Sequence, residues 1–422
     1  MDSVTSETAT GSAEELRAQF LAVRALSLDL VRGLSEADAT AQSMPDASPA
    51  KWHLAHTSWF FETFLLRDHV PGYRLQDPRW AYLFNSYYEA EGPRHPRPQR
   101  GLLTRPSLAE VIDYRLRVDE TLLEAMDIVA ERCPQLLALG LNHEQQHQEL
   151  LLTDLKHLFF HNPLSPAAWA EGPGNGGPHY VQAAGWLPQA EGLVSIGAAG
   201  NGFAFDCEGP AHLHFLRPHA LADRPVTNAE WFDFIDDNGY ATPSLWLSDG
   251  WAWVNAQSVE GPLYWRRDGR DWEQFTLSGW HHVDPAAPVA HISLYEADAF
   301  AAWAGARLPT EQEWEAAAQQ MNPAEGVQLD AAGPVQPRFL AESGGMFGNV
   351  WEWTGSPYRP YPGFRAAAGA VGEYNGKFMN GQFVLKGGSC ATPRGHVRAS
   401  YRNFFEPHQR WQFTGLRLAK DV

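Results

Sequence analysis

The stretch LGLNHEQQHQELLLTDLKHLFF (139–160) has the length and apolar spacing of a long helix, and it contains the pattern H-E-x-x-H. His143 and His147 are four residues apart, so on a helix they share one face, with Cβ atoms roughly 5 to 6 Å apart. Two imidazoles in that position can bind one metal ion. The stretch therefore predicts a helix on which two histidines can reach one metal ion.

H-E-x-x-H is also typical of zinc proteases, in which the glutamate acts as general base. That interpretation requires Glu144 beside the metal and a third ligand downstream. Neither H-x-x-G-x-x-H nor an N-E-x-x-D helix follows. Because the pattern also arises by chance in helices rich in Glu and Gln, we do not expect a peptidase.

Two other segments, residues 14–34 and 107–133, have apolar residues at helical spacing with charged residues between them. Residues 51–70 are a further segment of helix length. With the first segment they predict a four-helix bundle. After Asn162 the stretch NPLSPAAWAEGPGNGGPHY is rich in Pro and Gly, which predicts a linker.

Beyond the linker, short β-branched and aromatic runs such as GLVSIGA and FVLKGGS alternate with glycines, and helical stretches occur near 227–236 and 310–320. This pattern predicts a loop-rich α+β domain. A chain of 422 residues is long enough for two or three domains. The expected division is a disordered N-terminus (1–14), the bundle (15–163), the linker (164–185) and the second domain (186–422).

Charge and composition limit the partners. The formal net charge of −18 disfavours nucleic-acid binding, which needs concentrated Lys and Arg. Cys133, Cys207 and Cys390 are odd in number and scattered, which fits a reducing cytoplasm better than a disulfide framework. The N-terminus lacks a signal-peptide pattern, and no run of about 18 apolar residues occurs. We expect a cytoplasmic protein that does not span a membrane and acts on small molecules.

A third metal ligand is available upstream, where His53 and His56 are three residues apart. On a regular helix both cannot face the metal equally well, so one of them should be structural. If His56 joins His143 and His147, three neutral imidazoles would suit zinc or ferrous iron and leave positions open for substrates. The alternative is ordinary histidines satisfied by hydrogen bonds, and spacing alone leaves both interpretations open.

Longer motifs carry a resemblance. The segments SPAKWHLAHTSWFFE (48–62), YLFNSYYEAEGPRHPRPQRGLL (82–103) and NHEQQHQELLLTDLKH (142–157) closely resemble the EgtB family of non-haem iron sulfoxide synthases from ergothioneine biosynthesis. In the second half, PVTNAEWFDFI (225–235), RLPTEQEWEAAA (307–318), GGMFGNVWEWTGSPY (344–358), LKGGSCATPR (385–394) and GLRLA (415–419) resemble formylglycine-generating-enzyme type domains, which are similar to C-type lectins. The resemblance spans residues 15 to 420 approximately. It implies a DinB-like four-helix bundle followed by a lectin-like α+β domain.

The resemblance implies an iron(II) site made by His56, His143 and His147. There oxygen, the thiolate of a cysteine-type donor and hercynine, which is trimethylated histidine, would combine to a sulfoxide at imidazole C2. Three protein ligands on one face leave three octahedral positions, which suits a three-component reaction. Zinc could not substitute for iron, because zinc has no redox chemistry.

Two groups near the first motif are further candidates. Tyr87 and Tyr88 resemble the paired tyrosines of one EgtB subtype, in which a phenol supplies a proton or hydrogen atom during the oxidation; the alternative is ordinary aromatic packing. Arg94, Arg97 and Arg100 lie in a Pro-rich stretch that we expect to be non-helical. A guanidinium group there could bind the donor's carboxylate, with Arg97 the first candidate, and the alternative is a solvated basic loop.

The resemblance also implies substrate contacts elsewhere. Gln146 is expected to face the imidazole or the sulfur. Asn403, Phe404 and Phe405 resemble the family's hercynine pocket, in which aromatic faces attract the trimethylammonium group. Formylglycine-generating enzymes use two cysteines after GGS, whereas this chain has only Cys390 there, so that activity is not expected.

The sequence leaves the identity of the sulfur or selenium donor undecided. The YY and RHPRPQR patterns resemble the subtype that takes free L-cysteine, whereas other members use γ-glutamylcysteine. A selenoneine-type synthase that uses a selenosugar is the closest alternative. A non-catalytic protein that captures a quaternary amine is the alternative from another class.

Overall fold

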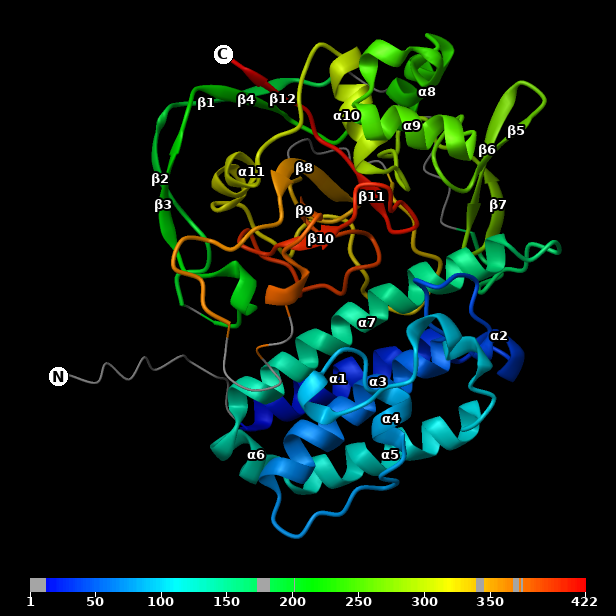
Figure 1. Ribbon diagram of the computed structural model, residues 1–422, viewed down its shortest axis with the longest axis vertical. Coiled ribbons are helices and arrows are strands. Elements are labelled where there is room, and N and C mark those ends of the chain that lie inside the picture. Colours follow the sequence, from blue (N-terminus) through cyan, green and yellow to red (C-terminus); the bar gives the residue numbers. More distant parts are fainter. Residues whose placement is uncertain (1–12, 173–182, 201, 339–344, 367–371, 373–374) are drawn as a thin grey trace. The chain divides into compact units, whose positions relative to one another are not determined.

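The computed structural model describes residues 13–172, 183–200, 202–338, 345–366, 372 and 375–422 (Figure 1). The chain forms two compact units. Unit 1 comprises Met1–Leu158, Ala198–Pro210 and Phe364–Gly376, and unit 2 comprises Phe159–Gly197, Ala211–Gly363 and Lys377–Val422. The N-terminus and the linker of the expected division lie partly outside the described residues, and its continuous boundaries stay a prediction.

Four long helices run side by side in unit 1 (Figure 1). They are α1 (Ala13–Val31), α3 (Ala50–Phe61), α5 (Leu108–Glu124) and α7 (Pro134–Phe160). Shorter elements connect them: α2 (Glu36–Thr40), the π-helix Glu62–Arg67, α4 (Trp80–Phe84), the 3-10 helices Glu89–Glu91 and Arg97–Leu102, and α6 (Met126–Arg132). The predicted helical bundle is confirmed. None of the helices in the described part of the chain combines the length and apolar character needed to cross a bilayer.

Helix α3 lies at the centre of the packing, because all of its residues are buried. A helix that is buried all round has no polar face on which to place its polar side chains. Buried polar groups need hydrogen-bond partners. The histidines of α3 must therefore find their partners on neighbouring helices and loops.

Helix α7 approaches α3 closely at Gly140. A Cβ atom added at this position would lie 2.7 Å from Cε1 of Phe61 and 3.1 Å from Cε1 of Phe60. The first distance is shorter than packed carbon atoms tolerate. The missing side chain thus allows the two helices to meet one turn before His143.

The Pro-rich stretch departs from expectation. It was expected to be non-helical, but Arg97–Leu102 forms a 3-10 helix, so this expectation is wrong for that part. Pro98 stands in its first turn, where the missing N–H needs no partner and the fixed φ suits a helix.

Unit 2 is a mixed α/β unit with four small sheets in its described part. The strand orders are β10–β9–β8–β11, β1–β4–β12, β5–β6–β7 and β2–β3. The bounds are β1 Trp186–Gln189, β2 Gly192–Ile196, β3 His212–Leu216, β4 His219–Ala222, β5 Trp265–Asp268, β6 Asp271–Thr276, β7 Gly279–His282, β8 Trp351–Pro357, β9 Phe383–Lys386, β10 Asn403–Phe405, β11 Thr414–Gly415 and β12 Ala419–Asp421. Strands β1 and β12 pair antiparallel with the two edges of β4, which joins the beginning and the end of the unit.

The helices of unit 2 are α8 (Asn228–Asp236), α9 (Ser248–Gln257), α10 (Leu294–Trp303) and α11 (Glu311–Ala318). Three of them start at capping boxes, in which Thr227, Ser293 and Thr310 are the N-cap residues. Helices α8 and α11 confirm the predicted helical stretches, and the mixed α/β character of the unit confirms the predicted fold class. Helices α9 and α10 were not predicted.

Candidate metal centre

Three histidines from α3 and α7 converge inside unit 1. His56, His143 and His147 each offer one nitrogen, and these atoms all lie within 4.8 Å of one another. Nε2 of His56 is 3.2 Å from Nε2 of His143. Two metal bonds of about 2.1 Å that meet at a right angle place their nitrogens about 3 Å apart. The observed separation therefore fits two ligands of one ion.

All three imidazoles are neutral at neutral pH. Burial lowers the pKa of His143 to about 3. Burial, followed by the neighbouring His143, lowers the pKa of both His56 and His147 well below the usual range. A neutral imidazole keeps one nitrogen lone pair, which is the form that binds metal.

The orientation of His56 is fixed from α4. Its Nδ1 donates to the carbonyl oxygen of Phe84 at 2.6 Å, so the neutral ring carries its lone pair on Nε2. The Trp52 indole stacks on the ring at a centroid distance of 4.6 Å and an interplanar angle of 11°. The His56 ring is thereby held with Nε2 directed at His143.

His53 lies behind His147 rather than in the group of three. Its Nδ1 is 2.8 Å from Nδ1 of His147, and its Nε2 is 3.1 Å from Oδ2 of Asp154. Both ring nitrogens of His53 are therefore engaged. Of the two histidines on α3, the geometry brings His56 into the possible ligand set.

Glu144, the acidic residue of H-E-x-x-H, is engaged elsewhere. Its carboxylate accepts hydrogen bonds from Ser27 Oγ at 2.6 Å, from Arg24 Nη1 at 2.8 Å and from Arg115 Nη2. Burial alone would raise its pKa, but the charges of Arg115 and Arg24 lower the pKa to about 2. Burial and Arg24 lower the pKa of Arg115, because two guanidinium groups share this carboxylate. Glu144 is thus a structural anion, which removes the general base that a protease needs.

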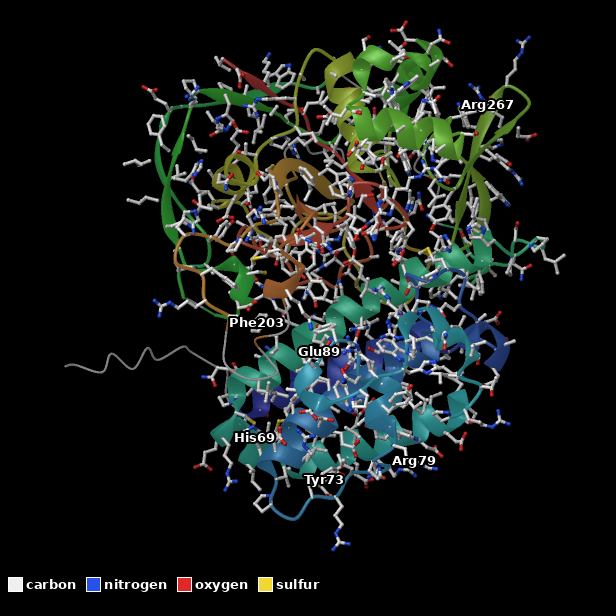
Figure 2. All side chains as sticks on the ribbon, viewed as in Figure 1. His69, Tyr73, Arg79, Glu89, Phe203 and Arg267 are labelled. Atoms are coloured by element: carbon white, nitrogen blue, oxygen red, sulfur yellow. The ribbon has the colours of Figure 1, made fainter. Side chains whose placement is uncertain are left out.

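The three candidate arginines have different surroundings. Arg94 pairs with Glu89, labelled in Figure 2, at 2.7 Å. Arg97 is exposed, and its Nη2 donates to the backbone oxygen of Asp46. Arg100 is only 3% exposed, and its guanidinium carbon lies 3.3 Å from the centroid of Trp52, the residue that stacks on His56. Arg100 is thus tied to the histidine group through the ring of Trp52.

No carboxylate pairs with Arg100 among the described residues. Its Nη1 donates to Ser48 Oγ at 2.9 Å and its Nη2 to Ser86 Oγ at 3.2 Å. Burial, followed by the charge of Arg97, lowers the pKa of Arg100 to about 8. A buried cation whose hydrogen bonds go to hydroxyl groups rather than to a carboxylate favours binding of an anion.

Tyr87 and Tyr88 follow α4, and their rings stack at 4.8 Å. Tyr88 is fully buried, whereas Tyr87 is half-buried. The Tyr88 ring lies 5.8 Å from Trp59 and 6.3 Å from Phe60. Trp59 contacts His56 and Phe60 contacts His143, so these two rings link Tyr88 to the histidines.

The remaining candidates lie on α7 and in unit 2. Gln146 is half-buried on α7, directly before His147. Asn403, Phe404 and Phe405 form β10 and are half-buried. The Phe404 ring stacks on Tyr358 at 4.2 Å. The substrate contacts expected of these residues stay predictions.

Several residues around the centre were not found from the sequence. Trp52 and the carbonyl of Phe84 hold His56, and Asp154 holds His53. For Asp154 a signal existed: it is seven residues after His147, which is about two helical turns and therefore the same face. Backbone carbonyl partners such as that of Phe84 have no sequence signal.

The fold and the site together define a two-domain protein whose helical bundle holds three histidines that could bind one metal ion. Residues 19–151 match the DinB superfamily, and residues 182–332 and 343–422 match the sulfatase-modifying factor enzyme 1-like domain. The chain is 34% identical to a hercynine oxygenase of Mycolicibacterium thermoresistibile, over 97% of this chain and 95% of that protein. It is also 34% identical to a hercynine oxygenase of Mycobacterium tuberculosis, over 97% of this chain and all of that protein.

The similarity to formylglycine-generating enzymes is narrower. The enzyme of Streptomyces coelicolor is 29% identical and matches 61% of this chain. Of these three proteins, only the two hercynine oxygenases are similar to this chain over nearly its full length. The chain belongs to the EgtB family of hercynine oxygenases, and it is an enzyme of that type. Membership implies non-haem iron as the metal of the histidine site.

Proposed function

We propose that this chain is an iron(II)- and O₂-dependent enzyme that joins a cysteine-type thiol to C2 of hercynine and oxidises the sulfur. The product is hercynylcysteine sulfoxide, an intermediate of ergothioneine biosynthesis. The observation that carries the proposal is the convergence of three neutral imidazoles within 4.8 Å, in a chain that matches hercynine oxygenases over 97% of its length.

The reaction balances with these three substrates alone. Hercynine loses the hydrogen on C2 and the thiol loses the hydrogen on sulfur as the C–S bond forms, which is a two-electron oxidation. Addition of one oxygen atom to sulfur is a second two-electron oxidation. Dioxygen accepts the four electrons, and its other oxygen leaves as water with the two hydrogens. No external reductant is required.

His56, His143 and His147 would hold the iron, which supplies oxygen binding and redox chemistry when bound. The three imidazoles come from two helices, α3 and α7. Neutral imidazoles add no charge to the iron. The protein ligands would therefore leave the positive charge of the iron uncompensated. This charge would favour the thiolate form of a thiol substrate over its protonated form.

Arg100 is the side chain that we assign to the carboxylate of the thiol donor. Its burial, its contact with Trp52 and its lack of a carboxylate partner among the described residues all support this role. A bound carboxylate would accept charge-assisted hydrogen bonds from its fork-shaped guanidinium group. Free L-cysteine is the favoured donor over γ-glutamylcysteine, because the YY and RHPRPQR segments resemble the cysteine-using subtype.

Tyr87 and Tyr88 are proposed to supply the proton or hydrogen atom during oxygen reduction. The half-buried Tyr87 and the buried Tyr88 stack on each other, so a change in either ring affects the other. Gln146 is proposed to contact the imidazole or sulfur from α7. Asn403, Phe404 and Phe405 are proposed to lie next to the trimethylammonium group, which the aromatic faces of Phe404 and Phe405 would attract.

The direct test is anaerobic reconstitution with iron(II), followed by hercynine, one donor and oxygen, with mass spectrometry of the product. We expect hercynylcysteine sulfoxide, with free cysteine outcompeting γ-glutamylcysteine when both are present. Failure to form a C–S bond with any thiol would overturn the proposal. A selenosugar that outcompetes both thiols would indicate a selenoneine-type synthase instead.

A binding protein without turnover gives a different result. It would bind hercynine without stoichiometric iron, and His143→Ala would leave hercynine affinity unchanged. We expect instead one iron per chain and no product from His143→Ala.

A further inference from the structure

We infer that His53 and Asp154 are positioning residues of the metal centre. A hydrogen-bond chain from Asp154 through His53 to His147 holds His147 in the tautomer that presents Nε2 to the metal. This inference rests on the proposed metal site, and it assigns a role to two side chains that are not among the ligands.

The chain of contacts determines where the protons lie. Oδ2 of Asp154 is 3.1 Å from Nε2 of His53, and a carboxylate oxygen accepts, so Nε2 of His53 carries the proton. If Nε2 carries the single proton of the ring, the lone pair of His53 lies on Nδ1. That atom is 2.8 Å from Nδ1 of His147, which must donate. His147 is thereby left with its lone pair on Nε2.

The opposite arrangement is unfavourable. If a His53 ring with a single proton donated from Nδ1 to His147, its Nε2 lone pair would face Oδ2 of Asp154 at 3.1 Å. Two acceptors would then meet in a buried place, which costs about 1 to 3 kcal/mol for each unsatisfied group. His147 would also carry its proton on Nε2 and could not bind metal there.

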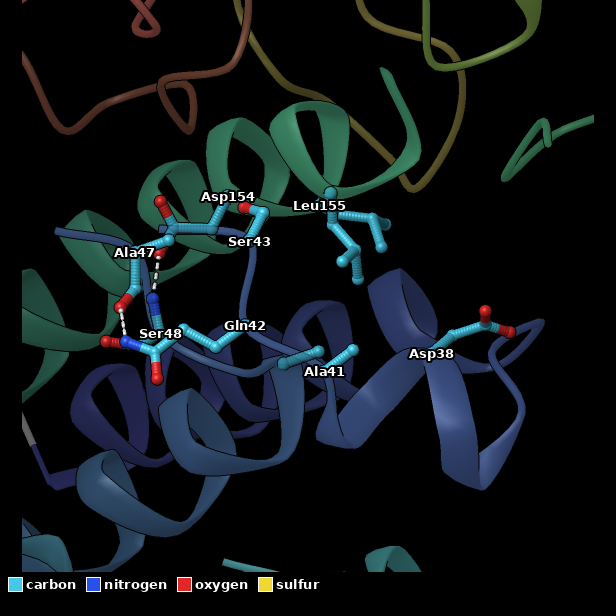
Figure 3. Close-up of a pocket in the computed structure, with 10 residues that line it drawn as sticks. Asp38, Ala41, Gln42, Ser43, Ala47, Ser48, Asp154 and Leu155 are labelled. Atoms are coloured by element: carbon cyan, nitrogen blue, oxygen red, sulfur yellow. Dashed lines mark hydrogen bonds between the residues drawn. The ribbon is translucent and has the colours of Figure 1, made fainter. Parts of the chain in front are cut away.

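Asp154 is itself held in position. Its Oδ2 accepts a second hydrogen bond from the backbone N–H of Ser48 at 2.8 Å, a contact drawn in Figure 3. The hydroxyl of Ser48 accepts from Arg100, so the same residue anchors both the relay and the proposed donor site. Asp154 is only 7% exposed and borders a cavity of about 10 Å³, the size of one water molecule.

The helices α3 and α7 also determine where Asp154, His53 and His147 lie. Asp154 follows His147 by seven residues on α7, so both side chains project from one face. His53 precedes His56 by one turn on α3. One helix pair therefore supplies both the ligands and the groups that orient them. Outer partners of this kind typically change metal affinity about 10- to 100-fold when they are removed.

Metal affinity provides the first test. We would titrate the metal-free protein with Co(II) alone and follow visible absorption, for the parent and for Asp154→Ala, Asp154→Asn and Tyr114→Phe. Tyr114→Phe is the matched control, because it removes a buried hydrogen bond of 2.6 Å to Glu62 in the same bundle but no contact of the relay. We expect Asp154→Ala to weaken Co(II) binding at least tenfold and the control to stay within twofold.

Asp154→Asn keeps one oxygen acceptor, removes the charge and replaces the second oxygen by an NH2 group. It reports on the relay if Asp154→Ala does not fold, and we expect at least threefold weaker binding. Parent-like Co(II) affinity in a folded Asp154 variant would overturn the inference. A parent protein that binds no Co(II) would instead contradict the proposed metal site itself, so the two failures are distinguishable.

The tautomers provide a second test that a purely structural role would not affect. Long-range ¹H–¹⁵N correlation spectra of metal-free protein with ¹⁵N-labelled histidine distinguish Nδ1–H from Nε2–H. We expect His53 as the Nε2–H form and His147 as the Nδ1–H form in the parent. In Asp154→Ala we expect His147 to populate both forms. A parent spectrum with His53 as the Nδ1–H form would overturn the inference.

Discussion

At the scale of single residues, the surroundings of a side chain decide its chemistry more than the motif in which it stands. His143 and Glu144 are neighbours in H-E-x-x-H. The first faces two other imidazoles, and the second faces Arg24 and Arg115. The spacing of His143 and His147 could be read from the sequence. The structure confirms that they converge with His56. The partners of Glu144 were not readable, because they lie on helices distant in sequence.

Glu144→Gln should lower the free energy of unfolding at neutral pH. The substitution leaves two buried guanidinium groups without their shared carboxylate, and breaking a buried pair costs about 3 to 5 kcal/mol. Urea unfolding at pH 7 measures the difference. Asp68→Asn is the control, because it removes an exposed ion pair with Arg67 and should change stability by less than about 1 kcal/mol.

The same carboxylate predicts a pH dependence. Its pKa is lowered to about 2 in the folded chain from an ordinary 4.5, so its contribution is complete above pH 4.5 and is lost as pH falls toward 2. In that range the difference in free energy of unfolding between the parent and Glu144→Gln should decrease by up to about 1.4 kcal/mol per pH unit. A gap that stays constant from pH 7 to pH 3 would show that Glu144 does not titrate as argued.

Arg97 and Arg100 make contrasting predictions for the donor. Arg100→Gln should raise KM for the thiol donor at least tenfold, because it removes the buried guanidinium group and its charge, whereas KM for hercynine should change little. Arg97→Gln should leave both KM values within about twofold, since that side chain is exposed and, among the described residues, donates to Asp46 alone. Steady-state kinetics, in which the thiol donor and hercynine are varied in turn, measures both KM values for each variant. A larger effect at Arg97 would assign the carboxylate to Arg97 instead.

At the scale of elements, amphipathic spacing identified the helices that have one polar face. Helices α1, α5 and α7 have such a face, and α8 and α11 start at Thr-x-x-Glu capping boxes. Helix α10, LYEADAFAAW, is apolar on most sides and buried, so it has no stripe that periodicity could detect. In the Pro-rich stretch, the prolines suit a 3-10 turn as well as a loop, and composition could not distinguish them.

The contact of α3 with α7 yields a prediction at Gly140. In most helices Gly→Ala is stabilising by about 1 kcal/mol. Here the added methyl group would lie 2.7 Å from the Phe61 ring, and overpacking of this kind costs about 1 to 3 kcal/mol. We expect Gly140→Ala to be destabilising by about 1 kcal/mol and to weaken Co(II) binding, because it pushes the histidines of the two helices apart. Increased stability in denaturant would contradict this packing.

At the scale of the whole molecule, sequence patterns predicted a bundle followed by an α+β domain, and both domain matches confirm that order. Patterns did not predict that segments Ala198–Pro210 and Phe364–Gly376 belong with the bundle in unit 1. One of their links is a hydrogen bond of 2.7 Å from Asn375 to Asp206. Such contacts join residues far apart in sequence, and they leave no periodic signal within either segment.

Removal of the metal should lower the stability of the bundle. An ion that binds the folded chain at 100 times its dissociation constant adds about 2.7 kcal/mol, because the unfolded chain does not hold three imidazoles together. We expect Co(II) to raise Tm by several degrees and a chelator to reverse this. His143→Ala should abolish the shift. A Co(II)-dependent shift that persists in His143→Ala would place the metal elsewhere.

The central claim is that His56, His143 and His147 together hold one iron ion. The direct measurement is anaerobic iron(II) binding stoichiometry for the parent and for alanine variants of each histidine. His157→Ala is the control, since His157 lies on the same helix and contacts Ser43 instead. We predict one iron per chain in the parent and the control, and less than a tenth in each of the other three variants. Full iron content in any of those three would contradict the account.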